Sequence, residues 1–216
     1  MGDPRLRVVV MISGRGTNMA AIAQACARRQ IRASVVSVLA DRDGAPGTAL
    51  AQELGVETAV VPYRGQGRAS FEKALAEKLE TRRPDLIALA GFMRILSPEF
   101  VGAWVGRILN VHPALLPRHR GLDTHRRVLD ARDSEHGASV HYVTPQVDSG
   151  PVILQSRLRV SPNDTEQTLS ARVQATEHIL YPRAIGWIAE GRLVWCEGRP
   201  MLDGRELAQP IVEDFD

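Results

Sequence analysis

The sequence predicts an α/β fold in which helices cover both faces of a mostly parallel, twisted β-sheet. Short apolar runs of strand length alternate with helical patterns along the first half of the chain, as in strands joined by crossover helices. After Pro113 the pattern changes to a loop, a helix and two neighbouring strands, which predict an antiparallel extension in the C-terminal half. Neither linker composition nor a repeat interrupts the 216 residues, so we expect one domain, 1–216, with halves at about 1–110 and 111–216.

The first half begins with a continuous apolar run at residues 7–12, which predicts a buried strand. The helix expected next, at 18–29, places Met19, Ile22 and Cys26 on one face. The same alternation predicts strands at 34–39, 56–61, 86–90 and 108–111, and helices at 48–54 and 70–81. The strands are short and apolar throughout, as expected for a sheet buried on both faces.

The second half is expected to begin with a loop rich in Pro, Arg, His and Gly that ends near Leu122. The predicted elements that follow are a helix at 124–131, strands at 138–143 and 152–160, and a helix from 164 to 189. The turn-rich segment between the two strands predicts an antiparallel pair. The spacing Asp164-x-x-Gln167 predicts a capping box for the last helix, which we expect to continue past Pro182.

The composition is that of an ordinary globular protein. Lys and Arg number 27 and Asp and Glu 25, so the formal charge is +2, and this near balance argues against binding nucleic acid or membranes through charge. No apolar run approaches the roughly 20 residues of a membrane-spanning helix, and the N-terminus lacks a signal-peptide core, so we expect a cytoplasmic protein. Cys26 and Cys196 lie far apart among apolar neighbours, which predicts two buried, reduced thiols and neither a disulfide nor a metal site.

Residues 13–18, Ser-Gly-Arg-Gly-Thr-Asn, join the first strand to the first helix. Glycines allow positive φ and leave no Cβ in the way, so backbone N–H groups can converge on an anion at the helix N-terminus. A dinucleotide fingerprint would have a third glycine where Met19 stands, although Asp41 lies near the distance of a ribose-binding acid, and no P-loop Gly-Lys-[Ser/Thr] follows. The segment predicts a site for a phosphorylated metabolite; the alternative is a tight turn in which Thr17 or Asn18 caps the helix.

Three polar residues of the second half predict chemistry. Asn110 and His112 lie two apart at the end of a predicted strand, so they project to the same face at the edge where open α/β sheets bind ligands. An Asn amide can donate to an oxyanion and a His can carry protons near pH 7, which suits acyl transfer. A carboxylate beside His112 would orient its ring and favour the imidazolium, and Asp148, in a glycine-containing turn, is the candidate, with His141 near a strand end. The residues leave two alternatives open: His112 could be a structural histidine, and residues 148–151 could form a plain turn.

Six stretches in order along the chain resemble the folate-dependent phosphoribosylglycinamide (GAR) formyltransferases of purine synthesis. They are 12–18 (ISGRGTN), 89–98 (LAGFMRILSP), 109–117 (LNVHPALLP), 137–143 (GASVHYV), 148–155 (DSGPVILQ) and 172–182 (RVQATEHILYP). One such stretch is a weak signal, whereas six in the family's order are specific. The resemblance implies the formyltransferase fold, with a Rossmann-like first half that binds the GAR phosphate and a second half that binds folate and carries catalysis.

The resemblance also implies a reaction and its residues. The amine of GAR would attack the formyl carbon of 10-formyltetrahydrofolate, and a tetrahedral intermediate would collapse to formyl-GAR and tetrahydrofolate without a metal or a covalent enzyme intermediate. The implied sets are the catalytic Asn110, His112 and Asp148; the GAR-binding Gly16, Thr17, Asn18 and Glu177; and the 10-formyltetrahydrofolate-binding Arg68, Met93, Arg94, Ile95, Leu96, Asn110, His141, Val143 and Thr144. Without the family, Glu177 would be taken as a surface acid of its helix.

Other functions stay open from the sequence alone. A methionyl-tRNA formyltransferase or a formyltetrahydrofolate hydrolase would share the catalytic scaffold, but each carries a further domain for which we expect no room in 216 residues. A non-catalytic nucleotide-binding module could use residues 14–18 and would not require the catalytic residues. Asp123 stands where many relatives have a His, although His125 is kept, so a loop-based proton relay of relatives is in doubt here. GAR and the folate are the expected partners, and a homodimer is left open.

Overall fold

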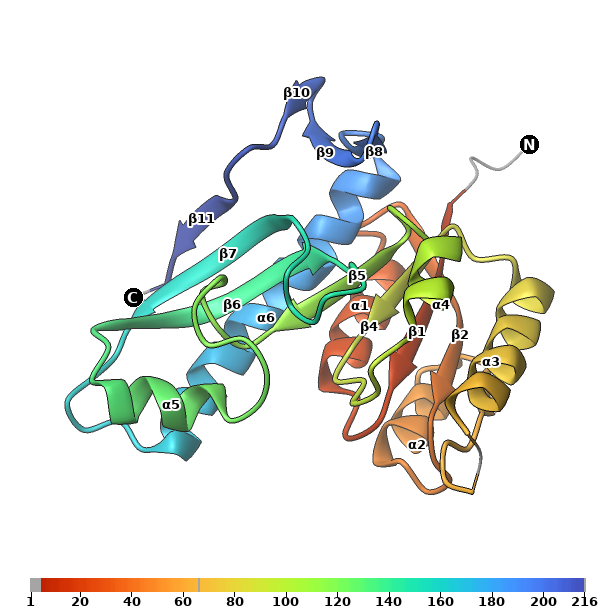
Figure 1. Ribbon diagram of the computed structural model, residues 1–216, viewed down its shortest axis with the longest axis horizontal. Helices are drawn as coiled ribbons and strands as arrows, with labels where there is room; N and C mark the ends of the chain where they lie inside the picture. The colour runs from red at the N-terminus through yellow and green to blue at the C-terminus, as the bar shows by residue number, and fades with distance from the viewer. Residues whose placement is uncertain (1–4, 66, 216) are drawn as a thin grey trace.

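A computed structural model describes residues 5–65 and 67–215 of the chain. An eight-stranded sheet runs through it in the spatial order β11-β7-β6-β5-β4-β1-β2-β3 (Figure 1). Its strands are β1 (Leu6–Ile12), β2 (Ala33–Ala40), β3 (Thr58–Val60), β4 (Leu86–Leu89), β5 (Ile108–His112), β6 (Glu135–Tyr142), β7 (Val152–Arg159) and β11 (Ile211–Asp214). Residues 1–4, which belong to the segment examined for a signal peptide, lie outside the described residues.

The strands of the first half pair in parallel, and β6 runs antiparallel to both β5 and β7. The predicted fold class, a mostly parallel sheet with an antiparallel extension in the second half, is therefore confirmed. Around the sheet lie the helices α1 (Thr17–Ala27), α2 (Pro46–Glu53), α3 (Arg68–Arg82), α4 (Pro98–Ala103), α5 (Thr124–Ala131) and α6 (Glu166–Ala189). Among the described residues, no helix has the length and apolarity needed to cross a bilayer.

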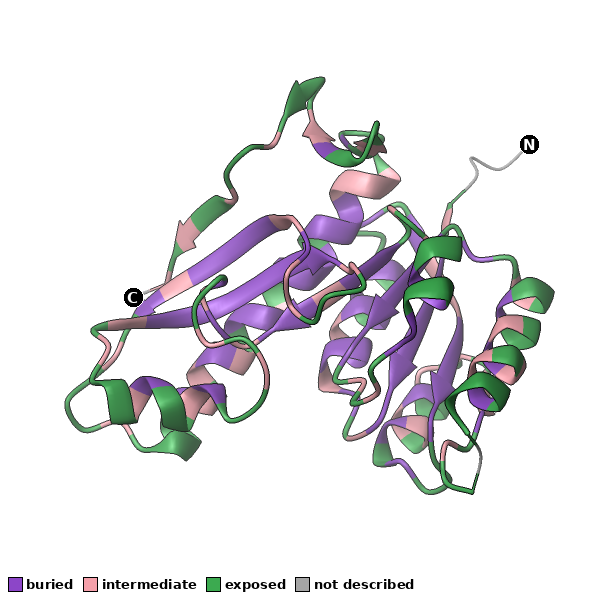
Figure 2. Cartoon of the chain, viewed as in Figure 1, coloured by how far each residue is buried: buried purple, intermediate pink, exposed green. Residues whose placement is uncertain are grey.

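The apolar runs of the sequence are explained by burial on both faces of the central strands (Figure 2). Alternate residues of β1 enter two separate cores, one formed with α1 and α6 and the other with α3 and α4. Val8 and Val10 belong to the first core, and Val9 and Met11 to the second. A parallel strand covered by helices on both sides has no solvent face, so period-two alternation is absent and the whole run is apolar.

Helix α6 is attached to two neighbouring strands of the sheet through the hydroxyl of Tyr181. The hydroxyl of Tyr181 lies 3.1 Å from the carbonyl oxygen of Leu89, the last residue of β4. It lies 2.9 Å from the carbonyl oxygen of Leu109, the second residue of β5. Tyr181 is fully buried, and its burial raises the pKa of the phenol well above the usual value, so it stays a hydrogen-bond donor. This contact fixes the position of α6 about one turn beyond Glu177.

Two sequence predictions about local structure are wrong. The capping box of α6 consists of Thr165 and Thr168, whose backbone N–H groups each donate to the other's hydroxyl, and not of Asp164 and Gln167. Asp164 instead accepts from the backbone N–H of Ser161, because the N-cap is Thr165, one residue later than predicted. Cys26 is buried, which raises the pKa of its thiol to about 11, but Cys196 is exposed.

Cys196 is exposed because it ends a strand of a small sheet that packs against the first core through Leu193 and Trp195 and leaves Cys196 at the surface. This three-stranded antiparallel sheet and the edge strand β11 were absent from the sequence prediction, as was α4. Its strands are β8 (Leu193–Cys196), β9 (Arg199–Leu202) and β10 (Arg205–Glu206). Strands of two to four residues with mostly exposed side chains show no detectable periodicity. Pairing with neighbouring strands stabilises them, whereas their own residue pattern contributes little.

Candidate active site

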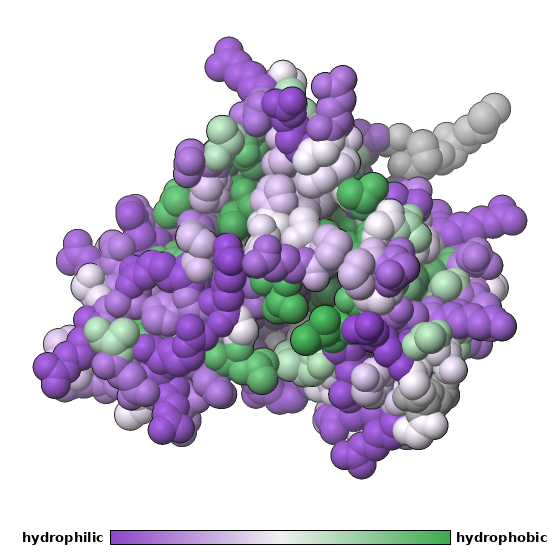
Figure 3. Space-filling view, in the orientation of Figure 1, coloured by the Kyte–Doolittle hydropathy of each residue, from purple (hydrophilic) through white to green (hydrophobic). Residues whose placement is uncertain are grey.

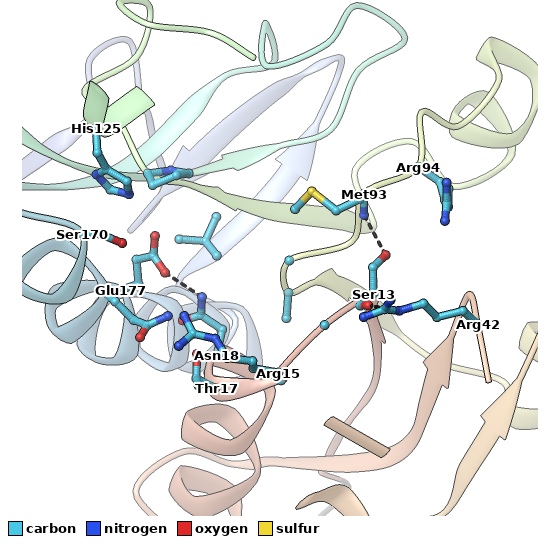
Figure 4. Close-up of a pocket in the computed structure, with 17 residues that line it drawn as sticks. Ser13, Arg15, Thr17, Asn18, Arg42, Met93, Arg94, His125, Ser170 and Glu177 are labelled. Atoms are coloured by element: carbon cyan, nitrogen blue, oxygen red, sulfur yellow. Dashed lines mark hydrogen bonds between the residues drawn. The ribbon is translucent and has the colours of Figure 1, made fainter. Parts of the chain in front are cut away.

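A cavity of about 560 Å³ opens beyond the carboxyl ends of β1, β4 and β5 (Figure 4). This is the edge at which open parallel sheets bind ligands. One wall is the glycine loop, residues 13–18, and the opposite wall is the segment that follows β4. His125 of α5 and three residues of α6, Ser170, Gln174 and Glu177, close the remaining side. Segments far apart in the sequence therefore meet at one site.

The glycine loop has its shape because two glycines pack against each other. Gly16 begins α1 with a φ of 74°, and a Cβ at this position would lie 2.9 Å from the Cα of Gly47. The backbone N–H of Gly47 donates to the carbonyl of Gly14 at 3.0 Å. No side chain caps α1, so the alternative in which Thr17 or Asn18 serves as the helix cap is wrong. The free N-terminus of α1 forms part of the cavity wall and favours an anion.

Asn18 and Glu177 lie next to each other in the wall of the cavity (Figure 4). The Asn18 amide nitrogen donates to Glu177 Oε2 at 2.7 Å, and both residues are buried. Burial raises the pKa of Glu177 to about 7, and the hydrogen bond from Asn18 offsets part of that rise. The amide oxygen of Asn18 has no hydrogen-bond partner among the described residues. Glu177 is thus not the surface acid that its helix pattern indicated, and it can carry or release a proton near neutral pH.

The segment after β4 is tied to the glycine loop. The backbone N–H of Met93 donates to the hydroxyl of Ser13 at 2.8 Å. Arg94 forms an ion pair with the buried carboxylate of Asp41, and its guanidinium lies 4.4 Å from the centre of the Tyr63 ring. Asp41, which the sequence placed where a ribose-binding acid could stand, binds an arginine instead. The structure therefore connects two of the predicted binding segments directly.

Only some of the residues expected to bind folate lie near one another. Met93 and Ile95 are 61% and 64% exposed, and apolar side chains gather beside a hollow near the centre of this face (Figure 3). The side chain of Leu96 is buried in the core formed with α3 and α4. Arg68 is exposed on the first turn of α3 and is not among the described residues that line the cavity. Val143 is half-buried and packs against the same core as Leu96, and Thr144 follows it in the chain.

Asn110 and His141 lie directly opposite each other in the antiparallel pair of β5 and β6. The Asn110 amide nitrogen is 3.2 Å from His141 Nε2, and His141 Nδ1 is 2.9 Å from the carbonyl oxygen of Tyr142. A carbonyl only accepts, so Nδ1 carries the proton and Nε2 accepts from the amide. Burial lowers the pKa of His141, which keeps it neutral. His141 therefore fixes the Asn110 amide and leaves its second N–H free.

Asp148 lies between the two histidines. Its Oδ2 is 3.4 Å from His112 Nδ1, and its Oδ1 is 3.7 Å from His141 Nε2. The turn that holds it packs closely on β6, since a Cβ at Gly150 would lie 1.8 Å from the carbonyl oxygen of Tyr142. The structure thus brings together Asn110, His112 and Asp148, which the sequence could not do.

The sequence predicts a loop after Pro113 but does not reveal that this loop contacts these residues. The carbonyl of His119 lies 2.9 Å from His112 Nε2, and the backbone N–H of Gly121 donates to Asp148 Oδ2 at 2.9 Å. Main-chain groups carry no residue signature, so no sequence signal could reveal these contacts. Within the described part of the chain, no cluster of His, Cys, Asp or Glu is arranged to hold a metal ion.

A further histidine contact borders the cavity. His125 Nδ1 lies 2.9 Å from His136 Nε2, with the two rings edge to face. Burial lowers the pKa of both side chains, that of His136 to about 3. Two rings whose pKa values are depressed share one hydrogen bond as neutral imidazoles, so this wall of the cavity carries no positive charge near neutral pH.

Comparisons with known proteins show the family of the chain. Residues 6–185 match the family described as formyl transferase. The chain is 43% identical to the phosphoribosylglycinamide formyltransferase of Escherichia coli strain K12, over 94% of this chain and 96% of that one; for the Haemophilus influenzae enzyme the values are 37%, 93% and 95%. The solved phosphoribosylglycinamide formyltransferase of Coxiella burnetii aligns with a TM-score of 0.91 at 42% identity, covering 96% of this chain and 100% of that one. The chain therefore belongs to the formyl transferase family and, within it, to the phosphoribosylglycinamide formyltransferases.

Proposed function

We propose that the chain transfers the formyl group of 10-formyltetrahydrofolate to the amine of GAR, giving formyl-GAR and tetrahydrofolate in de novo purine biosynthesis. The observation that carries this proposal is the meeting of Asn110, His112 and Asp148 beside a cavity with a helix N-terminus in its wall. An amide donor, an imidazole and a carboxylate suit acyl transfer to an amine. A helix N-terminus suits the phosphate of GAR.

GAR would occupy the cavity with its phosphate at Gly16, Thr17 and Asn18. Backbone N–H groups at the start of α1 favour an anion there. Asn18 and Glu177 would take the ribose or the glycinamide end, since together they offer an unpartnered amide oxygen and a carboxyl whose pKa is about 7. Both groups are buried, so a ligand that hydrogen-bonds them is preferred over one that leaves them unpaired.

The folate would lie on the other side of the catalytic residues, against Met93, Arg94, Ile95 and the segment after β6. The large exposed apolar side chains of Met93 and Ile95 support this position, because an aromatic pterin would cover them. Leu96 would contribute through its backbone, since its side chain is buried. Arg68 would attract the folate carboxylates. Arg94, whose charge is paired with Asp41, would border the folate together with Val143 and Thr144.

The amine of GAR would attack the formyl carbon and form a tetrahedral intermediate with charge on the formyl oxygen. The second N–H of the Asn110 amide would donate to this oxygen, because its first N–H is held by His141. Imidazolium at His112 would stabilise the same charge, with the Asp148 carboxylate offsetting the charge on the ring. Asp148 would then help to move a proton from the attacking nitrogen to the folate nitrogen as the carbon–nitrogen bond of the donor breaks.

One assay tests this function against the alternatives. The protein is mixed with 10-formyltetrahydrofolate, with and without GAR, and tetrahydrofolate release and formyl-GAR are both measured. We expect release that depends on GAR and equals the formyl-GAR formed. Release without GAR would show a hydrolase, and no release in either mixture would show a binding module.

A cytoplasmic location and a homodimer are proposed together with this activity. The near-balanced charge of +2 supports a protein that binds small anionic metabolites and does not bind to an anionic surface such as a membrane or nucleic acid. Cell fractionation tests the location, and sedimentation velocity over a wide range of protein concentration tests the dimer.

A further inference from the structure

The loop between β5 and α5, residues 113–123, touches two of the three proposed catalytic side chains through its main chain. The His119 carbonyl faces His112 Nε2 at 2.9 Å, and the Gly121 N–H donates to Asp148 at 2.9 Å. Any shift of residues 119–121 would therefore change the surroundings of both side chains.

The contact with His119 determines which nitrogen of His112 can exchange a proton. A carbonyl oxygen only accepts hydrogen bonds, so Nε2 must carry a hydrogen in the neutral as well as in the charged ring. Nδ1 is then the nitrogen that gains or loses a proton, and it faces Asp148 Oδ2 at 3.4 Å. The loop carbonyl thus selects one tautomer of His112 and the ring edge that faces Asp148.

The position of the His119 carbonyl depends on contacts made by its side chain. His119 has a φ of 53°, a left-handed conformation that costs a non-glycine residue free energy and needs support from its surroundings. Its ring Nε2 lies 2.6 Å from Oδ2 of Asp133, the second residue beyond α5. The other carboxylate oxygen of Asp133 pairs with Arg118. Asp133 therefore holds two successive loop residues.

Other parts of the loop are held independently of Asp133. The hydroxyl of Ser139 donates to the Ala114 carbonyl at 2.6 Å and accepts from the Leu116 N–H at 3.1 Å. Arg127 donates to the carbonyl of Arg120 at 2.6 Å. Loss of the Asp133 carboxylate should therefore release the middle of the loop while its two ends remain in place.

We propose that Asp133 is a positioning residue for formyl transfer: through His119 it holds the loop carbonyl that sets the tautomer and orientation of His112. This inference rests on the proposed catalytic role of His112. Asp133 lies outside the cavity and touches neither reacting group in this arrangement, so its effect should appear in turnover and not in substrate binding.

The first test is the kinetics of Asp133→Ala and His119→Leu. We expect kcat to fall about 10- to 100-fold in both, since small misplacements of a catalytic group have effects of this size, while the KM values for GAR and folate stay within about twofold. His119→Gln, which keeps an N–H donor near the position of Nε2, should recover most of the turnover. Arg118→Ala is the matched control, because it removes the other partner of Asp133 and should leave kcat near that of the wild type.

The second test reads the His112 ring in the free protein. The ¹⁵N chemical shifts of its ring nitrogens should report a hydrogen on Nε2 in the wild type and in Arg118→Ala, and a mixture of tautomers in Asp133→Ala and His119→Leu. Wild-type kcat and an unchanged ring spectrum in His119→Leu would overturn the proposal, as would an equal loss of turnover in Arg118→Ala. The spectrum does not depend on the substrate, so a failure of GAR-dependent transfer would overturn the proposed function without deciding this one.

Discussion

The glycine loop and the proposed catalytic residues are built in different ways. The glycine loop is six consecutive residues, and the binding groups proposed for it are backbone N–H groups at the start of α1. The proposed catalytic group consists of Asn110 and His112 of β5 and Asp148 of the loop between β6 and β7, so its side chains meet only in the folded chain. One region depends on local conformation, and the other depends on strand register and long-range contacts.

This difference separates binding from chemistry. Because backbone groups make up the proposed phosphate site, side-chain substitutions in the catalytic group should leave GAR binding largely intact. Changes in the conformation of the glycine loop should, in turn, weaken GAR binding before they affect the chemical step. Glu177, which is buried next to Asn18 and is held by α6, lies on the glycine-loop side.

The largest effect is expected from His112→Ala in the catalytic group. Loss of the imidazole should lower kcat about 10²- to 10⁴-fold with little change in the KM for GAR, because general acid–base catalysis is worth that much. Steady-state kinetics with both substrates measure it. His178→Ala, which removes a half-buried histidine of α6 outside this cavity, is the control and should keep normal turnover. Near-normal turnover in His112→Ala would end the catalytic assignment.

The next effect concerns Glu177→Gln and the dependence of stability on pH. The folded chain holds a proton on Glu177 up to about pH 7, whereas an ordinary glutamate loses it near 4.5, so the folded state binds more protons between these values. The wild type should therefore lose about 3 kcal/mol of stability across this window, and the variant should not. Urea unfolding at pH 4 and pH 8 measures the difference.

The exposed Glu80→Gln variant is the control for that experiment, and it should follow the pH profile of the wild type. Parallel profiles for Glu177→Gln and the wild type would mean that the buried carboxyl is ionised throughout the window. In that case Glu177 could not donate a proton to GAR near neutral pH.

The smallest effect is expected from Gly16→Ala in the glycine loop. A Cβ at a φ of 74° and 2.9 Å from Gly47 should cost about 1–2 kcal/mol of stability and raise the KM for GAR about tenfold, with kcat at saturation close to normal. Gly14→Ala is the matched control for stability, since its Cβ would meet no atom within 4 Å. If Gly16→Ala lowered kcat more than it raised KM, the two regions would not be separable.

Much of the fold follows from residue patterns. Strand β1 and helix α5 lie within one residue of their predicted ranges, because an apolar run and an amphipathic helical pattern are both local. The cap of α6 was misplaced by one residue, since Asp164, Thr165 and Thr168 all offer capping oxygens within one turn. The single domain predicted for the chain stays a prediction.

The candidate site also contains some features that the residue pattern predicts and others that it does not. The period of two along β5 predicts that Asn110 and His112 share a face, and the family resemblance adds Asp148 and Glu177. The pairing of Asp41 with Arg94 could not be predicted, because it joins the end of one strand to the segment after another. The roles of these residues in binding and catalysis stay predictions until the variants are measured.

The residue pattern alone was sufficient for the α/β architecture, the glycine loop and the family, because periodicity and short motifs act over a few neighbouring residues. It could not specify that His112 lies 3.4 Å from Asp148, that a loop carbonyl faces the ring, or that Glu177 is buried beside Asn18. Each of these contacts depends on strand register, helix position and loop path acting together. Their distances, and the pKa of Glu177 that follows from burial, arise only when the chain has folded.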